Sequence, residues 1–132
     1  MNKNLFEQCI EDCLSCYREC SACITHCISL GGKHVASEHL NLMMECAEVC
    51  RTSVELMLKQ SQFSLEMCEL CAKVCDACAE SCSSIDPDDS MMVECANKCR
   101  QCAESCREMI GQHQSESGRK SSGSMGATAQ AQ

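Results

Sequence analysis

The chain has 132 residues and fits one domain, since two domains of ~100–200 residues each would not fit. Its formal net charge is −8. The negative charge excludes nucleic acid and anionic membranes as expected partners. Aromatic residues are nearly absent, whereas the chain holds 17 Cys and 9 Met. Any core must therefore be built largely from sulfur-bearing side chains, which makes metal binding the first question.

The N-terminal segment shows no sign of export. It reads MNKNLFEQCIEDC and lacks the apolar stretch of ~7–15 residues and the cleavage site of a signal peptide. No other segment approaches the ~20 apolar residues of a membrane span. We therefore expect a cytoplasmic protein, in a compartment where thiols stay reduced and a cysteine-rich chain binds metal rather than forming disulfides.

The first two predicted helices carry cysteines at alternating steps of three and four residues, the spacing of the inner stripe of a packed helix. Gly31 and Gly32 predict that the first helix ends near Ser29, and Ser37 is expected to cap the second. The cysteines of these two segments are Cys9, Cys13, Cys16, Cys20, Cys23, Cys27, Cys46 and Cys50.

The third and fourth predicted helices repeat this spacing after a break near residues 59–61. Asp86 is expected to be the N-cap of the fourth helix, with Pro87 at its first helical position. After Gly111 the chain becomes rich in Ser, Gly, Ala and Gln, so residues 113–132 are predicted to be a disordered tail. The cysteines of these two segments are Cys68, Cys71, Cys75, Cys78, Cys82, Cys95, Cys99, Cys102 and Cys106.

Four helices joined by short loops predict an all-α fold, an antiparallel up-down-up-down four-helix bundle over residues 1–112. All 17 cysteines then lie on the inner stripes and line the core. Polar residues between them, such as Glu11, Asp12 and Arg18, are expected on a solvated outer face.

The cysteines form i,i+4 pairs whose Cβ atoms are ~5–6 Å apart, too far for a relaxed disulfide. A two-coordinate Cu(I) ion between two sulfurs suits such a pair. Soft thiolate ligands select Cu(I), zinc or iron–sulfur clusters. Continuous helical ligands favour Cu(I), and charge balance predicts about one Cu(I) per Cys. An iron–sulfur or zinc-binding cysteine-rich helical protein is the alternative.

The repeated C-x3-C pairs on four predicted helices resemble the bacterial copper storage proteins of the cytosolic branch, over about residues 5–113. That resemblance implies a homotetramer of four-helix bundles, many Cu(I) ions in each bundle interior and no catalytic turnover. We expect the copper to come from a copper chaperone or a small thiol donor.

Histidines and methionines suggest where copper passes into the bundle. His39 and Met43 lie four residues apart on the second inner stripe, and the predicted topology places Met92 at the same end. These side chains are predicted to receive Cu(I), although Met43 and Met92 could instead be gap-filling core residues. Met109 and His113 offer a second site at the opposite end. By contrast, His26 and His34 are expected to face solvent.

Overall fold

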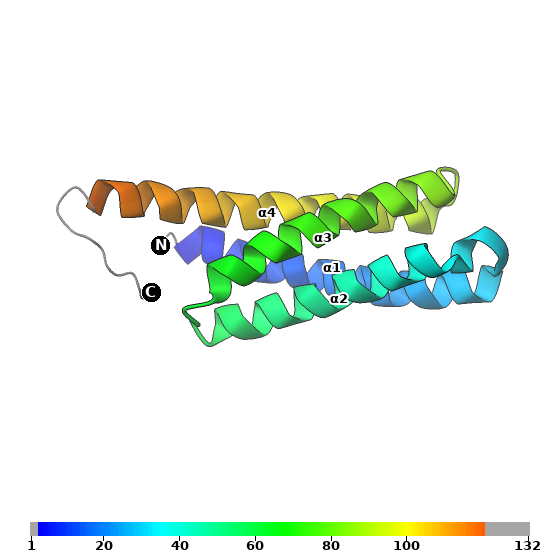
Figure 1. The fold of residues 1–132 in the computed structure, drawn as a ribbon, viewed down its shortest axis with the longest axis horizontal. Coiled ribbons are helices and arrows are strands. Elements are labelled where there is room, and N and C mark those ends of the chain that lie inside the picture. The colour runs from blue at the N-terminus through cyan, green and yellow to red at the C-terminus, as the bar shows by residue number, and fades with distance from the viewer. Residues whose placement is uncertain (1–2, 121–132) are drawn as a thin grey trace.

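The computed structural model describes residues 3–120. Within that range the long helices are α1 (Lys3–Leu30), α2 (Ser37–Leu58), α3 (Ser64–Ile85) and α4 (Ser90–Lys120), with a short 3-10 helix, η1 (Gly32–Val35), between α1 and α2. Successive helices run antiparallel, and α4 packs against both α3 and α1 (Figure 1). The predicted four-helix bundle is confirmed.

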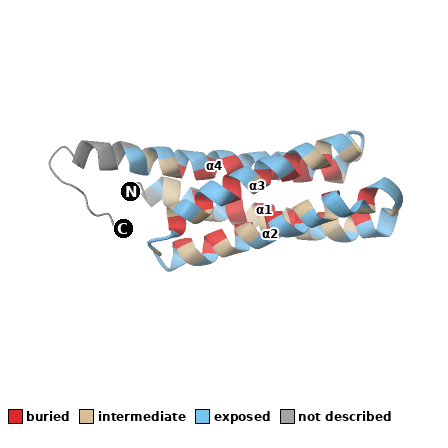
Figure 2. Ribbon diagram, in the orientation of Figure 1, coloured by how far each residue is buried: buried red, intermediate tan, exposed pale blue. Residues whose placement is uncertain are grey.

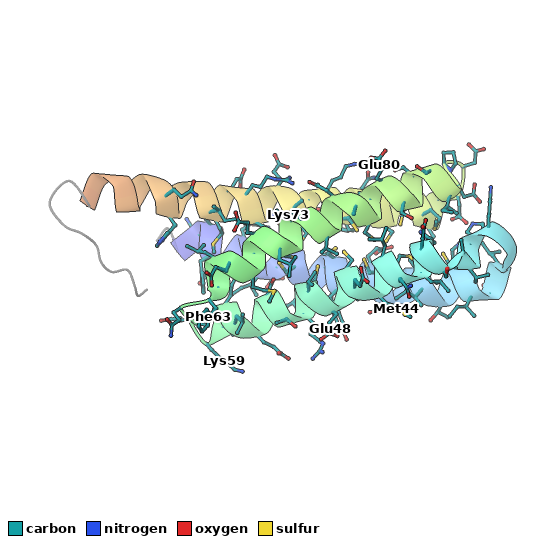
Figure 3. All side chains as sticks on the ribbon, viewed as in Figure 1. Met44, Glu48, Lys59, Phe63, Lys73 and Glu80 are labelled. Carbon is teal, nitrogen blue, oxygen red and sulfur yellow. The ribbon has the colours of Figure 1, made fainter. Side chains whose placement is uncertain are left out.

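Burial follows the inner stripes that the cysteine spacing predicts. All 17 cysteines have no exposed surface, and Figure 2 shows the buried residues on the facing sides of the helices. Charged residues such as Glu48, Lys73 and Glu80 point outward in Figure 3, and so do the exposed Met44 and Phe63. No helix in the described part of the chain is long and apolar enough to cross a membrane.

The two ends of the bundle differ in their connections. One end, here called the two-loop end, carries residues 31–36 and 86–89, and lies at the right in Figure 1. The other, the one-loop end, carries residues 59–63. At the two-loop end Gly31 has φ 70° and its N–H donates to the Cys27 carbonyl at 3.0 Å. Glycine adopts this left-handed conformation without steric cost, so Gly31 ends α1 as predicted.

The start of α4 differs from the prediction. Asp89, and not Asp86, supplies the capping carboxylate, because its Oδ1 accepts from the N–H groups of Met91 and Met92 at 2.9 and 3.3 Å. The N–H of Asp86 instead donates to the Cys82 carbonyl at 3.5 Å and closes the end of α3. Pro87 therefore lies in the loop and outside the helix.

The end of α4 also differs from the prediction. Helix α4 continues to Lys120, so the first part of the segment predicted as a tail from residue 113 is helical. Gly111 lies inside the helix, where one glycine costs ~1 kcal/mol relative to alanine and does not terminate it. The rest of the predicted tail, residues 121–132, lies outside the described residues.

One residue predicted on the outer face is buried. Asp12 lies between α1 and α4, where its carboxylate accepts hydrogen bonds from Gln8 and Gln101 at 3.1 Å and from Ser105. In the heptad that places Cys9 at d, Asp12 occupies position g, next to the inner stripe. Its hydrogen bonds satisfy the carboxylate where α1 meets α4.

Candidate metal centre

The cysteine sulfurs form one continuous group of contacting atoms along the bundle. All 17 are free thiols. The pair Cys71 and Cys75, four residues apart on α3, has its Sγ atoms 3.8 Å apart. Contacts between helices are equally close, with Cys46 donating to Cys75 at 3.6 Å and Cys50 lying 3.7 Å from Cys71. Each helix therefore presents its sulfurs to the sulfurs of its neighbours.

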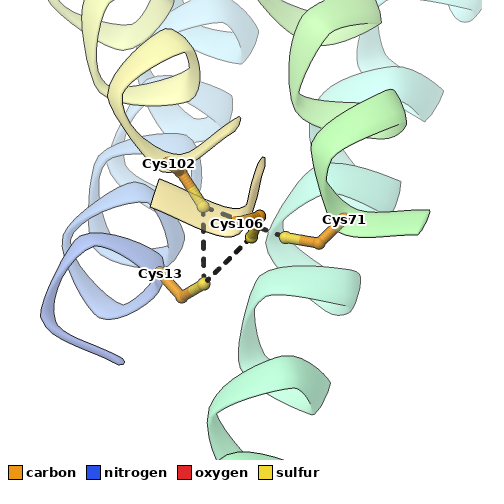
Figure 4. A group of neighbouring side chains, drawn as sticks. All are labelled: Cys13, Cys71, Cys102 and Cys106. Carbon is orange, nitrogen blue, oxygen red and sulfur yellow. Dashed lines mark hydrogen bonds between the residues drawn. The ribbon is translucent and has the colours of Figure 1, made fainter. Parts of the chain in front are cut away.

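The sulfurs gather into four-membered groups whose Sγ atoms all lie within 4.8 Å of one another. Such a group, shown in Figure 4, combines sulfurs from α1, α3 and α4. From the two-loop end to the one-loop end, five of these groups are Cys20/Cys78/Cys95/Cys99, Cys16/Cys20/Cys46/Cys99, Cys16/Cys46/Cys50/Cys75, Cys50/Cys71/Cys75/Cys102 and Cys13/Cys71/Cys102/Cys106.

Successive groups share two sulfurs, so that they form a ladder in which the shared pairs are the rungs. The four shared pairs are Cys20/Cys99, Cys16/Cys46, Cys50/Cys75 and Cys71/Cys102. A sulfur on a shared rung can contact ions on both sides of it. The arrangement is suited to a chain of metal ions bridged by thiolates, because every group shares two of its sulfurs with a neighbouring group.

Burial and thiol hydrogen bonds shape the protonation of these sulfurs. Burial raises the pKa of the Cys27 thiol, and the hydrogen bond with Cys23 opposes that effect. Deeper in the lumen, hydrogen bonds with neighbouring thiols raise the pKa of Cys50 and lower the pKa of Cys16. In both cases the hydrogen bond with Cys102 has the largest effect. A sulfur that donates keeps its proton, whereas one that accepts gives it up more readily. Neighbouring sulfurs therefore differ in how easily they ionise.

At the two-loop end a histidine and a methionine join the thiols. The His39 Nε2 atom lies 3.6 Å from the Cys27 sulfur, and the opposite ring nitrogen lies 2.7 Å from the Ser81 hydroxyl. Cys23 and Cys27 both donate to the Met92 sulfur at 3.5 Å. Burial lowers the pKa of His39, which favours the neutral imidazole that binds metals.

The remaining predicted ligands are divided between core and surface. Met43 and Met109 are fully buried, and at the one-loop end Cys68 donates to the Met57 sulfur at 3.9 Å. His113, predicted as a ligand beside Met109, is exposed on α4. The structure thus brings His39 and Met92 to the thiols but leaves His113 on the surface.

The other two histidines are not free in solvent as predicted. His34 is buried, and His26 is only partly exposed and hydrogen-bonds to Asp89 at 2.8 Å. His26 occupies heptad position g, like Asp12, so it flanks the inner stripe next to α4. The prediction failed because the 86–89 loop covers both rings, and loop positions do not follow from helical periodicity.

Comparison with known proteins identifies the family. Residues 2–111 match the family model described as copper storage protein. The chain belongs to the copper storage protein family. The resemblance drawn from the C-x3-C pairs is thereby confirmed.

Solved structures share the fold along most of this chain. A protein from Nitrosospira multiformis is 46% identical, with a TM-score of 0.77 over 84% of this chain and 99% of the other. The Cu(I)-bound copper storage protein BsCsp3 of Bacillus subtilis is 38% identical, with a TM-score of 0.75 over 80% and 98%. A cytosolic copper storage protein from Streptomyces lividans, solved with five coppers, is 27% identical, with a TM-score of 0.76 over 82% and 93%.

A curated relative matches over a shorter span. The uncharacterized cysteine-rich protein YhjQ of Bacillus subtilis is 40% identical over 61 residues. This alignment covers 46% of the present chain and 56% of the relative. The chain therefore aligns with little more than half the length of that protein.

Proposed function

We propose that this protein stores or buffers multiple Cu(I) ions in the cytoplasm, bound by the thiolates that line its bundle. The observation that carries the proposal is the ladder of buried sulfur groups, in which successive groups share two sulfurs. Thiolates are the ligands that Cu(I) prefers. Similar proteins include one solved with Cu(I) and one described as cytosolic.

Charge balance supports a capacity of about one Cu(I) per cysteine. A row of buried thiolates without counterions would be strongly unfavourable. If each sulfur bridges two ions and each ion takes two sulfurs, every thiolate charge is matched by one monovalent cation. For the 17 cysteines the expected load is about 17 ions.

Zinc and iron–sulfur clusters suit the ladder less well. Structural zinc takes four thiolates for itself, so that the lumen would hold only about four ions. If each zinc ion kept four thiolates of its own, two neighbouring groups that share a rung could not both be filled. Iron–sulfur clusters also use thiolates, but here the sulfurs lie on uninterrupted helices and contact one another directly. We expect no catalytic turnover, because the buried thiols serve as ligands for a cargo.

His39, Met43 and Met92 are proposed to receive copper at the two-loop end. Support comes from the 3.6 Å approach of His39 to Cys27 and from the two thiols that contact Met92. A thioether and a neutral imidazole bind Cu(I) without losing a proton, so they can pass it to the thiolates below. Met109 remains the candidate ligand at the opposite end, with His113 exposed beside it.

The source of the Cu(I) ions and the oligomeric state of the protein are proposed from the resemblance to copper storage proteins. A copper chaperone or a small thiol would deliver Cu(I), since free Cu(I) would be captured by cytoplasmic thiols. A homotetramer of bundles is the expected assembly, and sedimentation analysis of the full chain tests it directly. A monomer at micromolar concentration would remove that part of the proposal.

Anaerobic titration with Cu(I) in the presence of a competing chelator tests the function. We expect a colourless protein with ultraviolet sulfur-to-copper bands and a load of about one ion per cysteine. Saturation near four ions would favour the zinc alternative. A brown protein isolated with iron and sulfide would favour an iron–sulfur cluster and contradict the proposal.

A further inference from the structure

A second cluster of potential metal ligands lies outside the sulfur lumen, at the two-loop end. It consists of His26 from α1, His34 from η1, and Asp86 and Asp89 from the loop before α4. The Nε2 atom of His26 lies 2.8 Å from the Asp89 Oδ2 atom. The Nε2 atom of His34 lies 3.1 Å from the Asp86 Oδ2 atom and 3.8 Å from the same Asp89 oxygen.

The His34 ring carries an unused ring nitrogen into this cluster. His34 is only 7% exposed. Its Nε2 atom is completely covered, yet it has no hydrogen-bond partner in the described part of the chain. The Asp86 oxygen is close enough for an ion pair, but it is not aligned as a hydrogen-bond acceptor. A buried ring nitrogen that faces two carboxylates without a hydrogen bond has its lone pair available for a metal ion.

The spacing of these atoms fits one tetrahedral ion. Zinc binds histidine nitrogen at ~2.0–2.1 Å and carboxylate oxygen at ~2.0–2.2 Å, which places neighbouring ligand atoms about 3.3 Å apart. The three measured separations are 2.8, 3.1 and 3.8 Å and bracket that value. Asp89 Oδ2 takes part in two of them, so this oxygen links the ring nitrogens of His26 and His34.

We propose that His26, His34, Asp86 and Asp89 form a mononuclear site for a divalent transition-metal ion, with Zn(II) as the best fit. Two imidazoles and two carboxylates are nitrogen and oxygen donors, which suit a borderline divalent ion better than the soft Cu(I) of the lumen. The two carboxylates also neutralise both charges of the ion. The site is therefore distinct from the thiolate ladder in chemistry as well as in position.

The surroundings of Asp89 hold one ligand in place. Its second oxygen, Oδ1, accepts from the N–H groups of Met91 and Met92 at the first turn of α4. Outer hydrogen bonds of this kind orient a ligand and strengthen a site.

An ion at this site would tie together α1, η1 and the loop before α4. Met92, which contacts Cys23 and Cys27, follows Asp89 by three residues. A bound divalent ion would therefore hold the two-loop end in one arrangement and slow copper exchange there. That consequence rests on the proposed storage function, whereas the existence of the site does not.

Cobalt(II) is the probe for this site, because its spectrum separates nitrogen and oxygen ligands from sulfur. The full chain is loaded anaerobically with Cu(I), its copper content is measured, and Co(II) is then added. We expect one further Co(II) per chain, with visible ligand-field bands and no intense sulfur-to-cobalt charge transfer, and its displacement by Zn(II). The copper content reports separately on the storage function, so that failure of loading is seen before cobalt is added.

Two variants test the ligands, and a third serves as control. His34→Gln and Asp86→Asn should each weaken Co(II) binding at least about tenfold, since even the loss of an outer hydrogen bond weakens metal sites by ~10–100-fold. Asp88→Asn changes an exposed carboxylate in the same loop and should bind Co(II) as the unchanged chain does. In the copper-free chain the lumen thiols would bind Co(II) as well, so the variants are compared in the copper-loaded chain. Equal Co(II) binding in the unchanged chain and both ligand variants, or sulfur charge transfer from the additional ion, would overturn the proposal.

Discussion

Ser53 interrupts the sulfur stripe of α2 and offers a direct way to extend it. The residue lies three positions after Cys50 and four before Met57, on the same face of the helix. It has no exposed surface, and its hydroxyl has no hydrogen-bond partner in the described part of the chain. Replacing oxygen by sulfur at this position, Ser53→Cys, adds one thiol to the lumen with little change in shape.

Copper capacity should follow the number of thiols. With two sulfurs per ion and two ions per sulfur, the 17 cysteines hold about 17 ions and the Ser53→Cys variant about 18. Ser53→Ala is the matched control, because it removes the same hydroxyl without adding a ligand, and its capacity should stay unchanged. Native mass spectrometry of the fully loaded chains resolves single ions.

The free energy of unfolding gives a second measurement on the Ser53 variants. A buried hydroxyl without a partner costs ~1–3 kcal/mol. The free energy of unfolding of the reduced, copper-free chain should therefore rise by about that amount in Ser53→Ala, measured by urea denaturation. If Ser53→Cys folds normally but binds no more copper than Ser53→Ala, capacity does not depend on the thiol count and the bridging scheme is wrong.

Three further predictions address the thiols and the two-loop end. Replacing Cys71 and Cys75 together by Ala should lower capacity by about two ions, and an unchanged load in mass spectrometry would contradict the ladder. His39→Ala and Met43→Ala should change the rates of copper uptake and removal in stopped-flow experiments more than total capacity, whereas unchanged rates would move the uptake site to the one-loop end. Burial raises the pKa of Cys27, and Cu(I) binds the thiolate form of cysteine. The apparent affinity of the protein for Cu(I) should therefore rise with pH, and loading should release about one proton per ion. An affinity for Cu(I) that does not change with pH would contradict this.

The fold and the set of buried thiols could be predicted because one periodicity determines both. Steps of three and four residues place Cys9 through Cys27 on one helical face, and the same rule applies to every later run. Few other side chains could fill the core, so the cysteine stripe had to face inward. The antiparallel topology alone places His39 at the same end of the bundle as Met92, whereas its 3.6 Å approach to Cys27 is seen only in the structure.

The ladder itself could not be predicted from spacing. Which sulfur on α2 lies opposite Cys75 depends on the axial offset of the helices, and loop conformation sets that offset. Loop conformation also explains why the burial of His34 was not predicted, since His34 faces Asp86 from a separate loop. Asp89 was missed as the cap of α4 because Asp86-Pro87 is an equally good sequence signal for a helix start.

X-ray absorption at the copper edge of the fully loaded protein reports directly on which atoms surround the stored copper ions. Because successive sulfur groups share two thiols, each ion of the ladder should have only sulfur in its first shell and other copper ions just beyond it. We therefore predict sulfur scattering together with a clear copper–copper contribution. A first shell of nitrogen or oxygen, or sulfur-bound ions without copper neighbours, would contradict storage in a shared thiolate ladder.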